Sequence, residues 1–87
     1  MAHVRLRGPL RKLAGDRLEH RVDAATVAEA LHALERGEPG LCGWILDERG
    51  HVRRHLNVFV NGDQGRGDTP VGPADVVDVL PAISGGR

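Results

Sequence analysis

Cysteine and aromatic residues are scarce in this sequence. Cys42 is the one cysteine, so an internal disulfide is impossible, which fits a protein of a reducing cytosol. Trp44 and Phe59 are the only aromatic side chains, too few for a platform on which nucleic-acid bases stack. An excess of positive charge is also missing, because 12 lysine and arginine residues face 12 aspartate and glutamate residues. We therefore expect no nucleic acid among the main partners.

Long hydrophobic runs are absent too. No apolar stretch approaches the ~20 residues that span a bilayer, and residues 1–10 lack the apolar segment of a signal peptide. We therefore expect a cytoplasmic protein with no membrane partner. The five histidines show no metal-ligand spacing with Cys42, so no metal site is expected. The 87 residues, 40% of them hydrophobic and 28% charged, suffice for one small globular domain.

One helix is predicted over residues 26–36. It begins with a capping box, in which the Thr26 hydroxyl accepts from the Glu29 amide and the Glu29 carboxylate accepts from the Thr26 amide. Gly37 is expected in the left-handed conformation that closes such a helix. The apolar residues at helical spacing are Val27, Ala30, Leu31 and Leu34.

Four strands are predicted from alternating or β-branched segments, over residues 3–7, 18–22, 56–60 and 75–81. Residues 10–15 form a connection, and residues 63–72 form a glycine-rich polar loop after an Asn61-Gly62 turn. Residues 41–46 are predicted as a short helical turn that places Leu41, Trp44 and Ile45 on one face.

One helix covers only one face of a sheet. The predicted architecture is therefore α+β, with a mixed sheet packed on one main helix in two layers. We expect a folded domain over residues 1–81 and a flexible tail over residues 82–87, because the end of the chain is too small and polar to pack.

Alternation also predicts an apolar patch on the face of the sheet away from the helix. Val77 and Val79 are expected in the core, and the 56–60 strand is expected to turn Phe59 away from it. Val76 and Leu80 then point outward, so an exposed Phe59 beside Leu80 would form a patch for partner recognition near the tail.

The tail itself carries the chemistry that the sequence suggests. Gly85 and Gly86 have no side chain to obstruct entry of the backbone into a narrow channel. A terminal glycine carboxylate is also an unhindered acyl group that adenylation would make electrophilic. Taken alone, two glycines near the end of a chain are more often a frayed terminus than a functional one.

The sequence as a whole resembles the ThiS/MoaD family of ubiquitin-like (β-grasp) sulfur-carrier proteins. The similarity runs from about Val4 to Gly86 and is most specific in residues 75–86, DVVDVLPAISGG. Residues 57–62, NVFVNG, and 26–31, TVAEAL, resemble the family's third strand and the start of its helix. The resemblance implies a β-grasp fold with a mixed sheet of four to five strands.

The resemblance also implies a function that depends on partner enzymes. A ubiquitin-activating-type adenylyltransferase would use ATP to adenylate Gly86, with Gly85 as its slender neighbour, and sulfur transfer would give a thiocarboxylate. A biosynthetic enzyme would then accept the sulfur. The chain would bind no cofactor and would not be an enzyme. Its docking surface would comprise Phe59, Val76, Leu80, Pro81 and Ser84.

Two positions depart from the family pattern. Arg87 follows Gly86, so Gly86 is an amide carbonyl until a peptidase removes Arg87, unless Arg87 is foreign to the natural chain. Pro73-Ala74-Asp75 stands where many members have Asp-Gly-Asp, and Ala74 tolerates a positive φ poorly. The turn before the last strand is therefore expected to differ in shape.

Three alternatives to sulfur donation remain open from the sequence. The activated glycine could form an isopeptide, as in a ubiquitin-like modifier. The tail could insert into a large subunit, as in molybdopterin synthase. The chain could instead be a β-grasp interaction module in which the glycines are incidental. Among carriers, residues 53–61 look closer to those that serve cysteine synthesis or molybdopterin than to those of thiamin synthesis.

Overall fold

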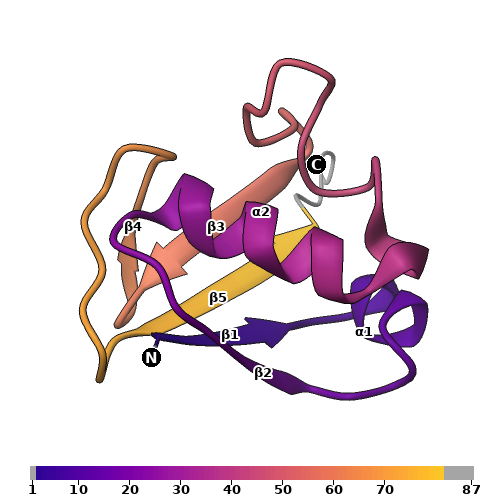
Figure 1. Ribbon diagram of the computed structural model, residues 1–87, viewed down its shortest axis with the longest axis horizontal. Helices are drawn as coiled ribbons and strands as arrows, with labels where there is room; N and C mark the ends of the chain where they lie inside the picture. Colours follow the sequence, from indigo (N-terminus) through magenta and orange to yellow (C-terminus); the bar gives the residue numbers. More distant parts are fainter. Residues whose placement is uncertain (1, 82–87) are drawn as a thin grey trace, which may run out of the picture.

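In the computed structural model, which describes residues 2–81, one main helix packs across a mixed five-stranded sheet (Figure 1). The strand order is β2-β1-β5-β3-β4, with β1 and β5 parallel and the other pairs antiparallel. The elements are β1 (Ala2–Leu6), α1 (Pro9–Leu13), β2 (Glu19–Val22), α2 (Val27–Gly37), the 3₁₀ turn η1 (Pro39–Leu41), β3 (Leu56–Val60), β4 (Asp63–Gln64) and β5 (Val76–Pro81). The predicted α+β, β-grasp architecture is confirmed.

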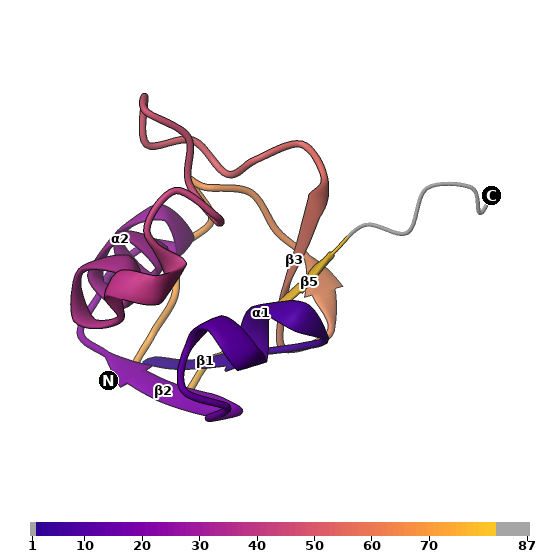
Figure 2. The ribbon, with the colours of Figure 1, turned by 90° about the vertical axis from the view of Figure 1, so that its right-hand side faces the viewer.

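The core lies between α2 and the sheet. The four apolar residues predicted for the inner face of the helix are all buried, as are Val77 and Val79 of β5. In β3, Leu56 and Val58 are buried and Val60 packs against the core, as alternation predicts. Figure 2 shows α2 on one side of the sheet; within residues 2–81, no element covers the opposite face.

The ends of α2 differ in two details from the prediction. The Thr26 hydroxyl accepts from the Glu29 amide at 3.2 Å, but the Glu29 carboxylate accepts from the Ala25 amide, not from that of Thr26. A bridge between Thr26 and Pro70 holds the chain extended before the helix and turns the Ala25 amide toward the carboxylate. At the other end Gly37 is still helical. The helix ends after it because Pro39 keeps Glu38 out of the helical conformation.

Two short elements were not predicted. Residues 10–15 contain most of α1, which begins at Pro9 and buries Leu10 and, just beyond its end, Ala14. Leu10, Leu13 and Ala14 have helical spacing, but one turn of it is too little periodicity to distinguish a short helix from a connection. β4 follows a turn in which Asn61 and Gly62 have φ values of 52° and 91°, as the Asn-Gly sequence predicts.

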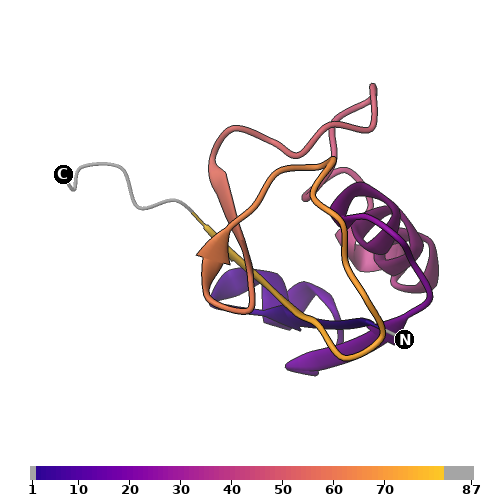
Figure 3. The ribbon, with the colours of Figure 1, turned by 90° about the vertical axis from the view of Figure 1, so that its left-hand side faces the viewer.

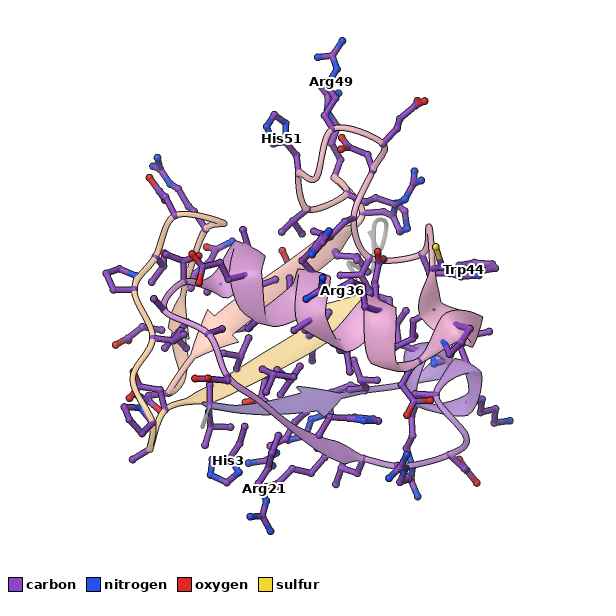
Figure 4. All side chains as sticks on the ribbon, in the orientation of Figure 1. His3, Arg21, Arg36, Trp44, Arg49 and His51 are labelled. Atoms are coloured by element: carbon purple, nitrogen blue, oxygen red, sulfur yellow. The ribbon has the colours of Figure 1, made fainter. Side chains whose placement is uncertain are left out.

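Residues 42–55 form an arm that rises from the end of η1 to the start of β3. Leu41 and Ile45 are buried as predicted, but Trp44 is 53% exposed and points into solvent (Figure 4). The predicted shared face is wrong because the helical turn ends at Leu41 and Gly43, with a φ of 86°, redirects the chain. One carboxylate oxygen of Glu35 on α2 accepts from the Ile45 and Leu46 amides, both at 3.0 Å, and fixes the base of the arm.

A hydrogen-bonded network joins the β3–β4 turn to the start of β5. The side-chain amide of Asn61 donates to Asp75 at 2.9 Å, and its oxygen accepts from the Val76 amide at 2.9 Å. The Asp75 carboxylate also accepts from the Gly72 amide at 2.7 Å. The bond from Asn61, together with that from Gly72, lowers the pKa of the Asp75 carboxyl. Ala74 needs no positive φ in this turn.

Glu35→Ala should destabilise the fold by about 2 kcal/mol, because two amides beside buried Ile45 and Leu46 lose their acceptor. Urea unfolding monitored by circular dichroism measures the loss. Glu48→Ala is the matched control, since Glu48 lies exposed on the same arm and makes no ion pair within the described residues. Equal unfolding midpoints for the two variants would contradict the role given to Glu35.

Asp75→Asn should remove part of the pH dependence of stability. The folded-state pKa of Asp75 lies below the unfolded value of about 3.9, so its ionised form stabilises the fold above that pH. This contribution is lost as the pH falls through the lower folded-state value. The wild type should therefore be more stable than the variant at neutral pH, and the difference should close as the pH falls below about 4. Urea midpoints at several pH values test this; a difference that does not change with pH would contradict it.

Candidate functional site

The uncovered face of the sheet has an ion-pair cluster near its centre. Alternation along β1 and β5 turns Arg5 and Asp78 to this face, where the two residues are register partners. Arg7 follows at the end of β1. The Asp78 carboxylate lies 3.4 Å from the Arg5 guanidinium and 3.3 Å from that of Arg7. All three side chains are partly exposed, so the cluster contributes orientation more than stability.

Phe59 and Leu80 meet beside this cluster. Phe59 is the register partner of Asp78, and Leu80 lies two residues further along the same face of β5. With Arg7, Gly62 and Asp78 they line one shallow depression. The structure therefore brings together the two apolar residues predicted for partner binding.

The exposure of this depression differs from the prediction in one respect. Phe59 was expected to be exposed, but it is only partly so, as is Leu80. The partial exposure of Phe59 follows from its surroundings, because the long side chain of Arg7 also lines the depression. The surface offered to a partner is thus an apolar floor with an arginine at its margin.

Val76 and Pro81 lie at opposite ends of β5. Val76 is partly exposed on the predicted face, but it pairs with His3 and lies about 17 Å along the strand from Pro81. It does not line the depression with Phe59. Pro81 ends β5 opposite Leu56, and a Cβ placed on Gly8 would lie 3.7 Å from its Cγ. The chain therefore leaves β5 close to the connection between β1 and α1.

The remaining predicted site residues lie beyond the described part of the chain. Ser84, Gly85, Gly86 and Arg87 belong to residues 82–87, which follow β5 directly. What the structure fixes is where that segment starts. Leu80 and Pro81 precede it immediately, so the depression that Leu80 lines lies next to the point where the segment with the glycine pair begins.

Sequence reasoning missed the arginines and the aspartate of the uncovered face. A signal for them was present: Arg5 and Arg7 alternate with core residues Val4 and Leu6, and Asp78 stands between Val77 and Val79. Such alternation predicts which face a side chain occupies, but not which strand becomes its neighbour. The parallel pairing of β1 with β5 supplies that information.

Within residues 2–81, no group of three or more histidine, cysteine, aspartate or glutamate side chains is placed to hold a metal ion. In the same range no helix has the length and apolar character needed to cross a bilayer.

Comparison with known proteins identifies the family. A sequence model of the ThiS family matches residues 4–86. Small archaeal modifier protein 3 of Haloferax volcanii is 36% identical over 69 residues, which cover 74% of this chain and 73% of the relative.

Solved structures give the same result. The crystal structure of small archaeal modifier protein 1 from Haloferax volcanii superposes with a TM-score of 0.81 and 31% identity, covering 98% of each chain. A chain in the crystal structure of the Amycolatopsis orientalis BexX/CysO complex superposes with a TM-score of 0.85 and 27% identity, covering 99% of this chain and 100% of that one. The family match over nearly the whole chain, on a fold shared with these structures, shows that the chain belongs to the ThiS family of ubiquitin-like sulfur carriers and modifiers.

Proposed function

We propose that this chain carries sulfur as a thiocarboxylate on Gly86 after a peptidase has removed Arg87. The observation that carries the proposal is the Gly85-Gly86 pair, which follows the end of β5 in a chain of this family. Gly86 lies five residues beyond Pro81, and five extended residues span about 17 Å. Such a length, if extended, is enough for the acyl group to enter a partner's active site.

The proposed chemistry takes place on the backbone. The Gly86 carboxylate attacks the α-phosphorus of ATP in a ubiquitin-activating-type adenylyltransferase, which releases pyrophosphate and leaves an acyl-adenylate. A sulfur nucleophile then attacks the acyl carbon and expels AMP. Sulfide gives the thiocarboxylate directly. A persulfide gives an acyl disulfide, whose S–S bond a second thiol then cleaves, forming a disulfide with the sulfur donor and releasing the thiocarboxylate. The chain contributes the unhindered carbonyl and the docking surface, and ATP is a substrate of the partner.

The docking surface is assigned to Phe59, Leu80 and Pro81, with Ser84 in the approach to the glycines. Support comes from the depression that Phe59 and Leu80 share and from its position next to the start of the tail. Val76 is placed at the far margin of the same face, beside His3. Apolar side chains framed by Arg7 and Asp78 have the composition of a small interface core with a charged rim.

A second candidate is conjugation to proteins. The relatives named small archaeal modifier proteins favour it, because the same activated glycine would form an isopeptide bond with a lysine amine. Both functions share the adenylation step and differ in the nucleophile. The likeness to a chain of the BexX/CysO complex favours binding to a partner protein. The sequence of residues 53–61 makes cysteine and molybdopterin synthesis the candidate destinations of the sulfur.

The intact mass of the protein from its native host should show the loss of one arginine residue and the replacement of one oxygen by sulfur. Iodoacetamide should add two carbamidomethyl groups to this form, one on the exposed Cys42 thiol and one on the nucleophilic thiocarboxylate. A variant that ends at Ser84 is the control, which should gain no sulfur and should be alkylated at Cys42 alone. A protein that keeps Arg87, and is not adenylated in the presence of its cognate peptidase and adenylyltransferase, would contradict the proposal. Full biological activity of the Ser84-terminated variant would favour the interaction module.

Phe59→Ala and Leu80→Ala should each weaken recognition by the adenylyltransferase. We expect the KM for the Arg87-free protein in ATP–pyrophosphate exchange to rise about tenfold, or about 1.4 kcal/mol, with kcat little changed. Leu18→Ala is the matched control, since Leu18 is an exposed apolar residue next to β2, at the other side of the sheet. Equal KM values for all three variants would contradict this docking surface.

A further inference from the structure

A groove of about 710 Å³ lies on the side of the molecule that carries α2. It is lined by residues of the arm, of β3, of β4 and the segment that follows it, and of the first turn of α2. Figure 3 shows how these elements are arranged. The groove shares no lining residue with the depression around Phe59 and Leu80. The groove is therefore a surface that the proposed sulfur chemistry leaves unused.

The floor of the groove is mainly apolar. Val52, Leu56, Val58 and Ala28 contribute to it from the arm, from β3 and from α2. A β-bridge between Leu46 and Val52 closes the arm on itself. The Glu35 carboxylate of α2, which accepts from the Ile45 and Leu46 amides, ties the base of the arm to the helix.

The outer edge of β3 is only partly used by the sheet. β5 pairs with all five residues of β3, but β4 pairs only with Phe59 and Val60. The Val58 carbonyl accepts from the Gly65 amide, so Val58 directs its backbone polar groups to the β4 side, and alternation directs those of Leu56 the same way. The Val58 amide and the Leu56 carbonyl therefore face the groove beyond the end of β4.

The rim of the groove is predominantly positive. Arg53 and Arg54 stand on the arm and Arg66 stands on the opposite wall, against a single acidic residue of the lining, Asp68. Within residues 2–81, neither Arg54 nor Arg66 takes part in a side-chain ion pair. His51 is at the same rim, and Figure 4 shows it projecting from the arm with Arg49.

Nearby acceptors engage only part of this rim. The Asp47 carboxylate accepts from the Arg49 and His51 amides, both at 2.9 Å, and holds the tip of the arm. The Arg53 guanidinium donates to the Gly43 carbonyl. Arg54 and Arg66 are exposed, so both remain available to a ligand.

The backbone donors in the first turn of α2 are already paired. The Val27 and Ala28 amides donate to the Thr69 and Gly67 carbonyls at 2.9 and 2.8 Å, and the Glu29 amide donates to the Thr26 hydroxyl. With these donors occupied, side-chain cations and the β3 edge are the groups left for recognition.

We propose that the groove binds an extended acidic segment of a partner protein, which adds to the free edge of β3. Backbone hydrogen bonds to Leu56 and Val58 would supply the pairing, and alternate side chains of the segment would contact the apolar floor and the arginine rim. The charge of the rim selects an acidic segment. The apolar floor and the strand edge, in a lining without tryptophan, tyrosine or phenylalanine, favour a peptide over a nucleic acid.

The probe is a synthetic peptide of about six residues, a typical strand length, in which glutamate alternates with valine. Added to the isotope-labelled full chain, it should shift the amide resonances of residues 56–58 and 64–68 and slow hydrogen exchange at the Val58 amide. The double variant Arg54→Glu/Arg66→Glu should weaken binding at least about tenfold. Arg21→Glu is the matched control, since Arg21 is exposed on β2 at the opposite edge of the sheet (Figure 4), and it should bind within about twofold of the wild type.

Several results would overturn the proposal. Equal affinity for a peptide with lysine in place of glutamate would show that the arginine rim does not select an acidic segment. Unchanged exchange at Val58 in the bound state would exclude strand addition. Tighter binding of an oligouridylate with the same shifts would assign the groove to nucleic acid. The lysine peptide and the Val58 measurement use the wild-type chain, so they decide the matter even if the double variant does not fold. None requires adenylation, so the outcome is separate from that of the sulfur-carrier proposal.

Discussion

The insertion of β5 between β1 and β3 is the constraint on which the rest of this structure depends. β5 buries Val77 and Val79 under α2 and pairs along its whole length with strands from opposite parts of the chain. Its other face brings Asp78 to Arg5 and Arg7, and Leu80 to Phe59. The segment that carries the glycine pair begins directly after its last residue. Core, uncovered face and tail position therefore follow from one strand.

The two proposed binding surfaces lie on different sides of the same sheet. The uncovered face is adjacent to the start of the tail and offers a small apolar depression with charged margins. The groove beside α2 uses the opposite edge of β3 and a positive rim. A partner on one surface leaves the residues of the other free. A carrier that must visit an activating enzyme and an acceptor in turn gains from such independence.

Much of this arrangement could be predicted from the sequence, because periodicity reports burial directly. The faces of β3 and β5 and the buried side of α2 follow from alternation and helical spacing. The outward turn of Trp44 could not, since it depends on Gly43 redirecting the chain after a very short 3₁₀ turn. The Asp78 cluster and the groove also escaped prediction, because both arise between segments distant in the sequence, whereas the glycine pair is visible in the sequence alone.

The parallel pairing of β1 with β5 joins the first and last strands of the domain. During synthesis β1 must wait for every other element before its central neighbour exists, and Val4 and Leu6 stay without their β5 cover until then. Contacts this distant in sequence make folding late and cooperative. A domain interrupted before β5 thus lacks both a closed core and the residues that carry the glycine pair. Under the proposed function, an unfinished copy has no glycine to present to a partner enzyme.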